Sequence, residues 1–121
     1  MVKFTIPGKL PSLNEYAKAS SFYAAANLKK RTEKHICKHI KKDLGETKVN
    51  KPANFIFYWI ERNKRRDKDN IAAAKKFIFD SLVKTGVIVD DHWDIVLRFT
   101  DKFLLDEQNP RVEVEIDAEE G

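Results

Sequence analysis

Hydrophobic and polar positions alternate in several parts of the chain, and this alternation predicts four strands. Residues 2–6 alternate before Pro7 ends the run, and residues 110–117 (PRVEVEID) alternate equally clearly. Residues 54–60 are dense in aromatic and β-branched side chains, which favours a well-buried strand. A further apolar run predicts a strand near residues 95–101.

Apolar residues with helical spacing predict two main helices. The first covers about residues 24–44 and ends at Gly45. Its apolar positions are Leu28, Ile36, Ile40 and Leu44. The second is capped by Asp69 or Asn70 and continues to Gly86. Its apolar positions are Ile71, Ala74, Ile78 and Leu82. Both patterns are typical of amphipathic helices that lie on a sheet.

The remaining segments predict loops and turns. Residues 8–16 contain proline, glycine, serine and asparagine, which favour a loop. In addition to the four strands of the element order, a short apolar piece after Gly86 is expected to return as a short strand, and the chain then turns at Asp90 and Asp91. The element order β, α, β, α, β, β predicts an α+β fold with a small mixed sheet and two main helices. With no repeat or linker, we expect a single domain over residues 1–121.

Composition narrows the class of protein. Apolar residues make up 42% of the 121 residues and charged residues 35%, as in soluble globular proteins. The single cysteine, Cys37, excludes an internal disulfide and fits a reducing compartment. The start of the chain lacks the apolar core of a signal peptide, and no run is long enough to span a membrane. We therefore expect a cytoplasmic protein without a membrane partner.

Charge is distributed unevenly along the chain. Residues 1–76 hold 19 Lys and Arg against 7 Asp and Glu, whereas residues 77–121 hold 4 against 12. A strongly basic surface attracts phosphate polymers by releasing their counterions. A chance gradient on a soluble protein is the alternative interpretation of the charge alone.

The segment NKRRDKDN, residues 63–70, places two carboxylates among cations. Asp67 and Asp69 are one residue apart, so in an extended segment their side chains project to the same side. Their mutual repulsion is relieved by a divalent cation, and oxygen-only ligands select Mg²⁺ or Mn²⁺. The surrounding cations are candidate phosphate contacts. They are Lys64, Arg65, Arg66 and Lys68.

A second acidic pair, Asp90 and Asp91, follows the second predicted helix. If the fold brings the two pairs together, three or four carboxylates surround one or two metal ions, a layout suited to phosphodiester hydrolysis. Lys75 or Lys76, within that helix, is placed to contact the scissile phosphate or the leaving oxygen. Alternatively, the aspartates only cap a helix and form a solvated turn, and the lysines cover an exposed face.

Other motifs carry weaker signals. The string DKDNIA begins like a calcium loop, but Ala72 and Ile78 stand where its glycine and glutamate belong. His35 and His39 are one helical turn apart and lack a further ligand, so we expect structural or surface roles. Three aromatic residues near basic ones are suited to stacking on bases, although a core role is the expectation. They are Tyr16, Phe22 and Tyr23.

The segment RRDKDNIAAAKKFIFDSLVKTGVIVDD resembles the signature of the RusA family of Holliday-junction resolvases. The segment IPGKLPSLNEY resembles the opening strand and loop of that family. The resemblance implies a homodimer that binds four-way DNA junctions and nicks two symmetry-related strands with Mg²⁺, with Mn²⁺ as a substitute and no small-molecule cofactor. By position, Asp67 and Asp69 match the D-x-D carboxylates, Asp91 matches the essential aspartate of the second pair, and Asp90 matches its partner.

The resemblance identifies the catalytic lysine less directly. The interval between the D-x-D-N motif and FDSL is about one helical turn longer than in the family, and counting back one turn from Asp80 selects Lys76, with Lys75 in reserve. Phe77 and Phe79 are suggested dimer contacts. The predicted DNA-binding residues are Lys64, Arg65, Arg66, Lys68, Lys75, Lys29, Lys30 and Arg31. A non-catalytic binder of branched DNA and a nuclease specific for flaps or forks are the alternative functions.

Overall fold

The four strands form one mixed sheet in the order β1-β4-β2-β3. The computed structural model describes residues 1–118. Strand β4 pairs antiparallel with both β1 and β2, while β2 and β3 are parallel. The strands are β1 (Val2–Pro7), β2 (Ala53–Glu61), β3 (Val96–Leu105) and β4 (Arg111–Ala118). The mixed sheet and the α+β class predicted from the sequence are confirmed.

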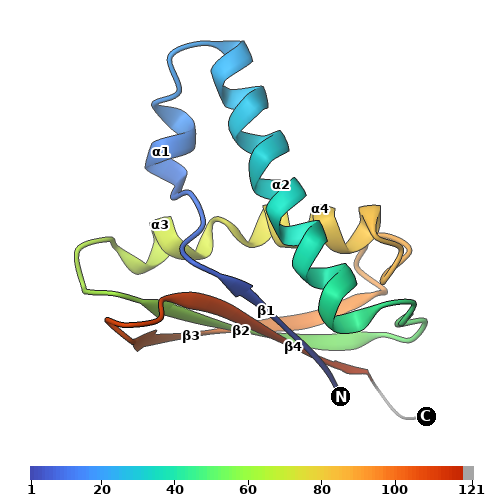
Figure 1. The fold of residues 1–121 in the computed structure, drawn as a ribbon. Coiled ribbons are helices and arrows are strands. Elements are labelled where there is room, and N and C mark those ends of the chain that lie inside the picture. The colour runs from blue at the N-terminus through green and yellow to red at the C-terminus, as the bar shows by residue number, and fades with distance from the viewer. Residues whose placement is uncertain (119–121) are drawn as a thin grey trace.

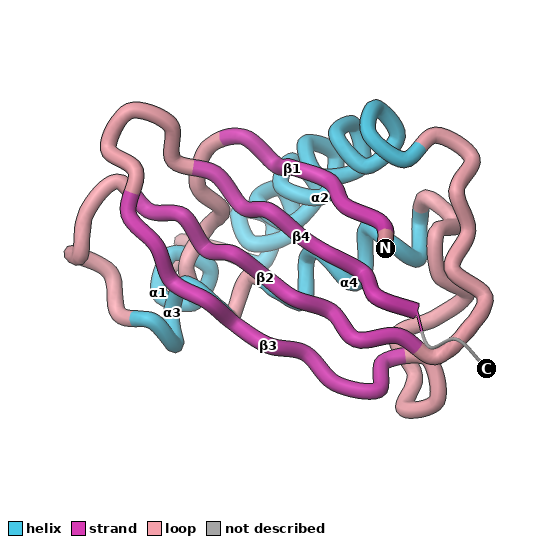
Figure 2. Tube along the Cα trace, turned by 90° about the horizontal axis from the view of Figure 1, so that it is seen from below, coloured by secondary structure: helices cyan, strands magenta, loops and turns pink. Residues whose placement is uncertain are grey.

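All helices lie on one face of this sheet, as the view from below shows (Figure 2). Helices α2 and α4 pack against each other, and α2 also packs against β1. Helices α1 and α2 form a hairpin that rises away from the sheet (Figure 1). The helices are α1 (Leu13–Ala17), α2 (Phe22–Leu44), α3 (Lys68–Ala72) and α4 (Lys75–Lys84). None of the helices in residues 1–118 combines the length and the apolar character needed to cross a membrane.

The core lies between the helices and the upper face of the sheet. Alternate residues of each inner strand are buried because side chains of a strand point to opposite faces. The strands contribute Phe4, Ile6, Phe55, Phe57, Trp59, Val112, Val114 and Ile116. The helices contribute Ile36, Ile40, Ile71, Ala74, Ile78, Phe79 and Leu82. The apolar positions of the second predicted helix are therefore all buried, which confirms their helical face.

The segment before α2 differs from the sequence prediction. Residues 13–16 were expected to be loop, but they belong to helix α1. The hydroxyl of Ser12 accepts a hydrogen bond from the backbone N–H of Glu15 at 3.1 Å and caps this short helix. Tyr16 then packs edge-to-face on Phe77, with ring centroids 5.8 Å apart, so a tertiary contact stabilises a helix that local composition disfavours.

The second predicted helix is divided into α3 and α4. Its N-cap is Asp67 rather than Asp69 or Asn70, and the Asp67 side chain makes no capping hydrogen bond. The backbone tightens between the two segments: the N–H of Ala74 donates to the carbonyl of Ile71 at 3.2 Å, one residue closer than in an α-helix. This tight turn lies in the interval where the sequence is one helical turn longer than the family pattern.

The segment after Gly86 is a bend and not the short strand that we expected. Gly86 has a positive φ of 79°, which ends α4 at a position that favours glycine. Val87 and Ile88 are buried within the bend, and the carbonyl of Val87 accepts a hydrogen bond from Val49 at 2.7 Å. The apolar residues after Gly86 are therefore explained by the burial of Val87 and Ile88 in the core and not by pairing with another strand.

Candidate functional site

The loop between β2 and α3 contains the cations of the NKRRDKDN segment. Arg65 is exposed, whereas the side chain of Arg66 is only 17% exposed. Arg66 donates from Nε and Nη2 to both carboxylate oxygens of Glu61, at 3.0 and 2.9 Å, and from Nη1 to the carbonyl of Leu10 at 2.8 Å. Arg66 therefore attaches the N-terminal loop to the end of β2, a role that the sequence did not reveal.

Asp67 and Asp69 lie at the beginning of α3 and are both exposed. Asp69 Oδ1 accepts a hydrogen bond from the backbone N–H of Asn70 at 3.0 Å. Asp67 lines a cavity of about 390 Å³ between this loop and the end of β3, together with Lys64 and Lys68. Four predicted members of the site thus share one hollow: Lys64, Arg66, Asp67 and Lys68. Asp67 occupies the N-cap position of α3, as the capping alternative expected, but its carboxylate makes no capping hydrogen bond.

Helix α4 brings Lys76 to the second acidic pair. Lys76 Nζ donates to Asp91 Oδ2 at 2.9 Å and lies 3.1 Å from Asp80 Oδ1. Lys29, from α2, lies 3.7 Å from Asp80 Oδ2. We call these four residues, Lys29, Lys76, Asp80 and Asp91, the lysine–aspartate cluster. Asp80 served only as a counting landmark in the sequence, although its spacing of four from Lys76 is a signal for a helical ion pair.

The charges of this cluster stabilise one another. The hydrogen bonds that Lys76 makes with Asp91 and Asp80 raise the pKa of its ammonium group above the ordinary 10.5. The hydrogen bond from Lys76 lowers the pKa of Asp91 below the ordinary 3.8. Lys76 is therefore a cation and Asp91 an anion throughout the neutral range. Such a lysine stabilises negative charge rather than accepting a proton.

A hollow of about 290 Å³ adjoins the cluster between α1, α2 and α4. Lys29, Lys76 and Asp80 line it on the charged side, and Tyr16 and Phe77 line it on the aromatic side. The cluster is thus accessible from the side of the α1–α2 hairpin.

The neighbouring Lys75 points in another direction. Its side chain is 14% exposed and donates to Asp101 Oδ2 at 2.6 Å, while its Nζ lies 3.8 Å from the ring centroid of Phe99. Trp59 Nε1 donates to the other oxygen of Asp101 at 2.9 Å. Lys75 therefore holds the beginning of α4 against β2 and β3. Of the two lysines that the sequence left open, Lys76 is the one in contact with Asp91. DNA contact by Lys75 stays a prediction.

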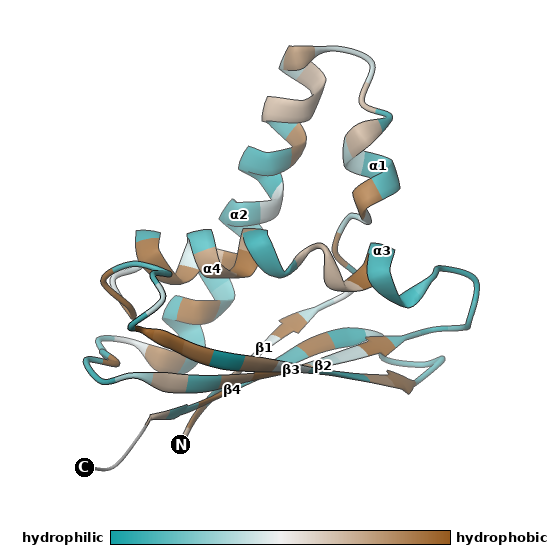
Figure 3. Cartoon of the chain, turned by 180° about the vertical axis from the view of Figure 1, so that it is seen from behind, coloured by the Kyte–Doolittle hydropathy of each residue, from teal (hydrophilic) through white to brown (hydrophobic). Residues whose placement is uncertain are grey.

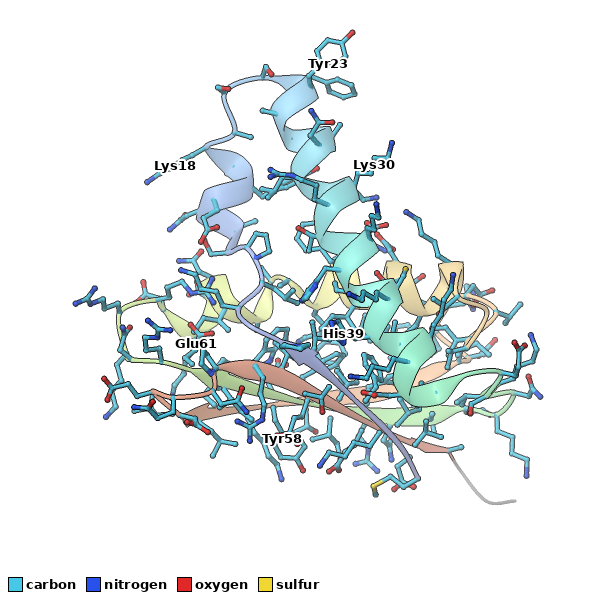
Figure 4. The ribbon with its side chains drawn as sticks, viewed as in Figure 1. Lys18, Tyr23, Lys30, His39, Tyr58 and Glu61 are labelled. Atoms are coloured by element: carbon cyan, nitrogen blue, oxygen red, sulfur yellow. The ribbon has the colours of Figure 1, made fainter. Side chains whose placement is uncertain are left out.

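The outer face of α2 is strongly basic, as its sequence indicated. The one carboxylate between residues 18 and 42, Glu33, is buried at 1% exposure. Lys84 pairs with Glu33 Oε1, and Lys29 Nζ lies 3.3 Å from Oε2 without hydrogen-bond geometry. The spacing of Glu33 from Ile36 and Ile40 places it on the buried stripe of the helix, which is the signal that could have identified it. Lys30 projects from one flank of α2, on the face where the sequence predicted DNA contacts (Figure 4).

The donor chemistry of the predicted carboxylates suits a magnesium ion. Within residues 1–118, however, no three His, Cys, Asp or Glu side chains lie close enough together to hold a metal. Asp90 Oδ1 accepts the backbone N–H of His92 at 3.0 Å, and Asp91 is paired with Lys76. A four-carboxylate ligand set of Asp67, Asp69, Asp90 and Asp91 stays a prediction.

The other candidate residues have structural contacts or lie at the surface. His35 Nε2 lies 2.9 Å from the carbonyl oxygen of Pro7, and His39 packs against His35 with ring centroids 4.9 Å apart. Phe79 is in the core, in contact with Phe55 and Phe57, and so has little surface for a dimer contact. Phe22 and Tyr23, for which a core role was expected, are exposed at the tip of the α1–α2 hairpin, so that expectation was wrong.

Comparison with known proteins agrees with the motifs of the sequence. A search among curated proteins found no match. The family described as endodeoxyribonuclease RusA matches residues 11–117, which include both acidic pairs, both helices of the hairpin and the lysine–aspartate cluster. The chain therefore belongs to the RusA family of endodeoxyribonucleases, the Holliday-junction resolvases that its sequence resembles.

Proposed function

We propose that this protein is a Mg²⁺-dependent endonuclease that resolves four-way DNA junctions by paired symmetric nicks. The observation that carries the proposal is the contact of Lys76 with Asp91 at 2.9 Å. This contact joins the helix that follows the D-x-D motif to the second acidic pair, two features of the family signature that are distant in sequence. The metal and the mechanism rest on this geometry together with the membership of the family.

Each residue of the site has a proposed role. Lys76 neutralises charge that develops on the scissile phosphate, because its raised pKa keeps it cationic. Asp67, Asp69, Asp90 and Asp91 are the proposed ligands of Mg²⁺, and Mn²⁺ is a chemically similar substitute. When bound, the metal activates water and neutralises phosphate charge. The proposed DNA contacts are Lys64, Arg65, Arg66, Lys68, Lys75, Lys29, Lys30 and Arg31.

A cleavage assay tests the assignment. Labelled four-way junctions, flaps and forks are incubated with the wild type in Mg²⁺ or in EDTA, and with Asp69→Asn, Asp91→Asn and Asp94→Asn. Asp94 is a matched control because it lies close to Asp91 in sequence but has a side chain that is 87% exposed. We expect paired nicks in the wild type and Asp94→Asn only with Mg²⁺, and none in the other two variants.

The alternative functions give different results in the same assay. Junction binding without metal-dependent nicks would favour a non-catalytic DNA-binding protein, and preferential cutting of flaps or forks would favour the other nuclease. Asp69→Asn should retain or improve junction affinity, because it removes a negative charge that faces phosphate. A large loss of affinity in correctly folded Asp69→Asn would contradict its placement beside the DNA.

We also propose that the active form is a homodimer that associates through the edge of β3. A four-way junction has near two-fold symmetry, so a two-fold dimer presents one site to each of two opposed strands. Strand β3 is at an edge of the sheet and carries apolar stretches at both ends (Figure 3). Its half-exposed apolar residues are Leu97, Phe99, Leu104 and Leu105.

Light scattering after size-exclusion chromatography tests this interface. Leu105→Glu should shift the protein from dimer to monomer, because it places a charge in the apolar contact. Leu13→Glu is the matched control, since Leu13 is equally exposed at 53% but lies in α1. A wild type that is monomeric at micromolar concentration, or a Leu105→Glu variant that remains a dimer, would contradict the proposed edge contact.

The proposed substrate agrees with the cytoplasm of a bacterial or phage-infected cell as the location of the protein. No small-molecule cofactor or membrane partner is part of the proposal.

A further inference from the structure

The tip of the α1–α2 hairpin carries two exposed aromatic side chains. Phe22 is 85% and Tyr23 79% exposed, although large aromatic side chains are usually at least partly buried. Their rings contact each other edge-to-face with centroids 6.3 Å apart. Figure 4 shows Tyr23 at the summit of the hairpin, pointing away from the sheet and the core. The pair therefore contributes little to the packing of this chain.

The hairpin is fixed at its base and free at its tip. Tyr16 packs on Phe77 of α4, and Arg66 holds the carbonyl of Leu10 at 2.8 Å and lies 3.7 Å from Glu15. The hydroxyl of Ser21 accepts the backbone N–H of Ala24 at 3.1 Å and caps α2 directly before the aromatic pair. A helix cap and an anchored base hold the two rings in a defined position instead of leaving them on a flexible loop.

The charge around the tip suits a polyanion. Between residues 18 and 42 the only carboxylate is Glu33, which is buried, so the exposed charges of this segment are all positive. Lys18 and Lys30 project from the two flanks of the hairpin (Figure 4). Aromatic faces within a cationic surface are the combination that binds nucleic-acid bases and backbone together. An apolar protein partner would not require this density of cations, and membership of an endodeoxyribonuclease family favours DNA over an anionic lipid surface as the polyanion.

The tip also lies at a useful distance from the lysine–aspartate cluster. Lys29, a member of that cluster, is seven residues after Phe22 on the same helix. Seven residues of α-helix span about 10 Å. The rise of one DNA strand is about 3.4 Å per nucleotide, so the tip is about three nucleotides from a phosphate at the cluster.

We infer that Phe22 and Tyr23 stack on bases at the branch point of the DNA, about three nucleotides from the cleaved phosphate. In continuous duplex DNA the faces of the bases are covered by their neighbours, whereas at a branch point stacking is interrupted and faces become available. The aromatic pair would thus distinguish branched DNA from duplex, while the lysines bind either form. This inference rests on the proposed function, because it assigns the substrate's branch point to a part of the same site.

Binding to junctions that contain 2-aminopurine at and near the branch point tests the inference. The protein carries Asp91→Asn, so that binding is measured without cleavage, and is compared with the same protein carrying Phe22→Ala and Tyr23→Ala. We expect the double alanine variant to lose about 5- to 150-fold in junction affinity, the range that stacking of one base on an aromatic side chain gives. Its affinity for duplex and the salt dependence of binding should be unchanged, because no phosphate contact is removed.

Two further variants separate stacking from simple hydrophobic contact. Phe22→Trp with Tyr23→Trp should retain the affinity and the fluorescence change of 2-aminopurine, since both residues keep an aromatic face. Phe22→Leu with Tyr23→Leu should behave like the alanine variant, since leucine is apolar but cannot stack. Equal junction affinity and equal fluorescence for the alanine and parent proteins would overturn the inference alone. A parent protein that does not bind junctions would overturn both the inference and the proposed function.

Discussion

Replacing Arg66 with alanine removes three hydrogen bonds from a largely enclosed site, whereas the same change at Arg65 removes none of them. The Arg66 guanidinium bonds both oxygens of Glu61 and the carbonyl of Leu10, and its side chain is 17% exposed. Hydrogen bonds to charged groups contribute about 1.5–3 kcal/mol each, and a buried acceptor left without a donor costs about 1–3 kcal/mol. These contributions are not additive, so we expect Arg66→Ala to lower the free energy of unfolding by about 3 kcal/mol.

That loss corresponds to a large shift in thermal stability. With an unfolding entropy of about 2.1 cal/mol/K per residue, a chain of this length loses roughly 4 °C in Tm per kcal/mol. Arg66→Ala should therefore unfold about 12 °C below the wild type. Arg65 is exposed, and Arg65→Ala should change the free energy of unfolding by less than about 0.5 kcal/mol. Urea unfolding, followed by tryptophan fluorescence, measures the free energy of unfolding of both variants.

DNA affinity should depend on the two arginines in the opposite order: Arg65→Ala should lose more junction affinity than Arg66→Ala. Among residues 1–118 the guanidinium of Arg65 has no ion-pair partner, so Arg65→Ala should weaken junction binding and reduce the salt slope by about 0.9, the value of one phosphate contact. Three of the five donors of Arg66 are already engaged, so folded Arg66→Ala should lose less affinity than Arg65→Ala. A loss of less than about 1 kcal/mol in the stability of Arg66→Ala, or an equal loss in Arg65→Ala, would refute this reasoning.

Three further outcomes are expected. The pKa of Asp91 is lowered in the folded protein, so the pairing of Asp91 with Lys76 stabilises the fold above pH 3.8. This stabilisation is lost as the pH falls through the folded pKa of Asp91. The pKa of Lys76 is raised, so the same pairing stabilises the fold at pH values up to 10.5 and is lost as the pH rises through the folded pKa of Lys76. Urea unfolding should therefore show Lys76→Met less stable than the wild type by up to about 1 kcal/mol at neutral pH, and the difference should shrink as the pH falls below 3.8. Asp101→Ala leaves Lys75 without its partner and should lower the unfolding free energy by about 2 kcal/mol in the same assay, unlike the exposed control Asp117→Ala. Removing Mg²⁺ with EDTA should abolish nicking in a gel assay but preserve junction binding in an anisotropy assay, because the cationic surface does not depend on the metal.

The sequence predicted the repeating elements well because periodicity is a local property. Alternation in residues 2–6 and 110–117 identified β1 and β4, which pair antiparallel with each other. Helical spacing identified the buried face that includes Ile71 and Ile78. It missed helix α1 because the capping by Ser12 and the contact of Tyr16 with Phe77 outweigh the loop-forming composition. The Ser12 cap is local, but the contact of Tyr16 with Phe77 joins two segments that no local window includes.

For the candidate site, too, the sequence identified some residues, and the tertiary structure decided the contacts of others. The motif residues Asp67, Asp69, Asp90 and Asp91 were identified from spacing and from resemblance to the family. Counting back one turn from Asp80 favoured Lys76 and kept Lys75 in reserve, but the count alone does not show what each of these adjacent side chains contacts. The sheet beneath α4 separates them: Asp101 of β3 holds Lys75, and Lys76 projects toward Asp91.

By itself the sequence determined the four strands of the sheet, helix α2, the buried stripe that α3 and α4 share, and the motif that identifies the family. Only the tertiary structure decided which charged residues are available to bind DNA and which are already engaged in the fold, as for Arg65 and Arg66. The physical reason is that the energy of a charged side chain depends on its partners and on its exposure to water, and both are set by segments that are distant along the chain.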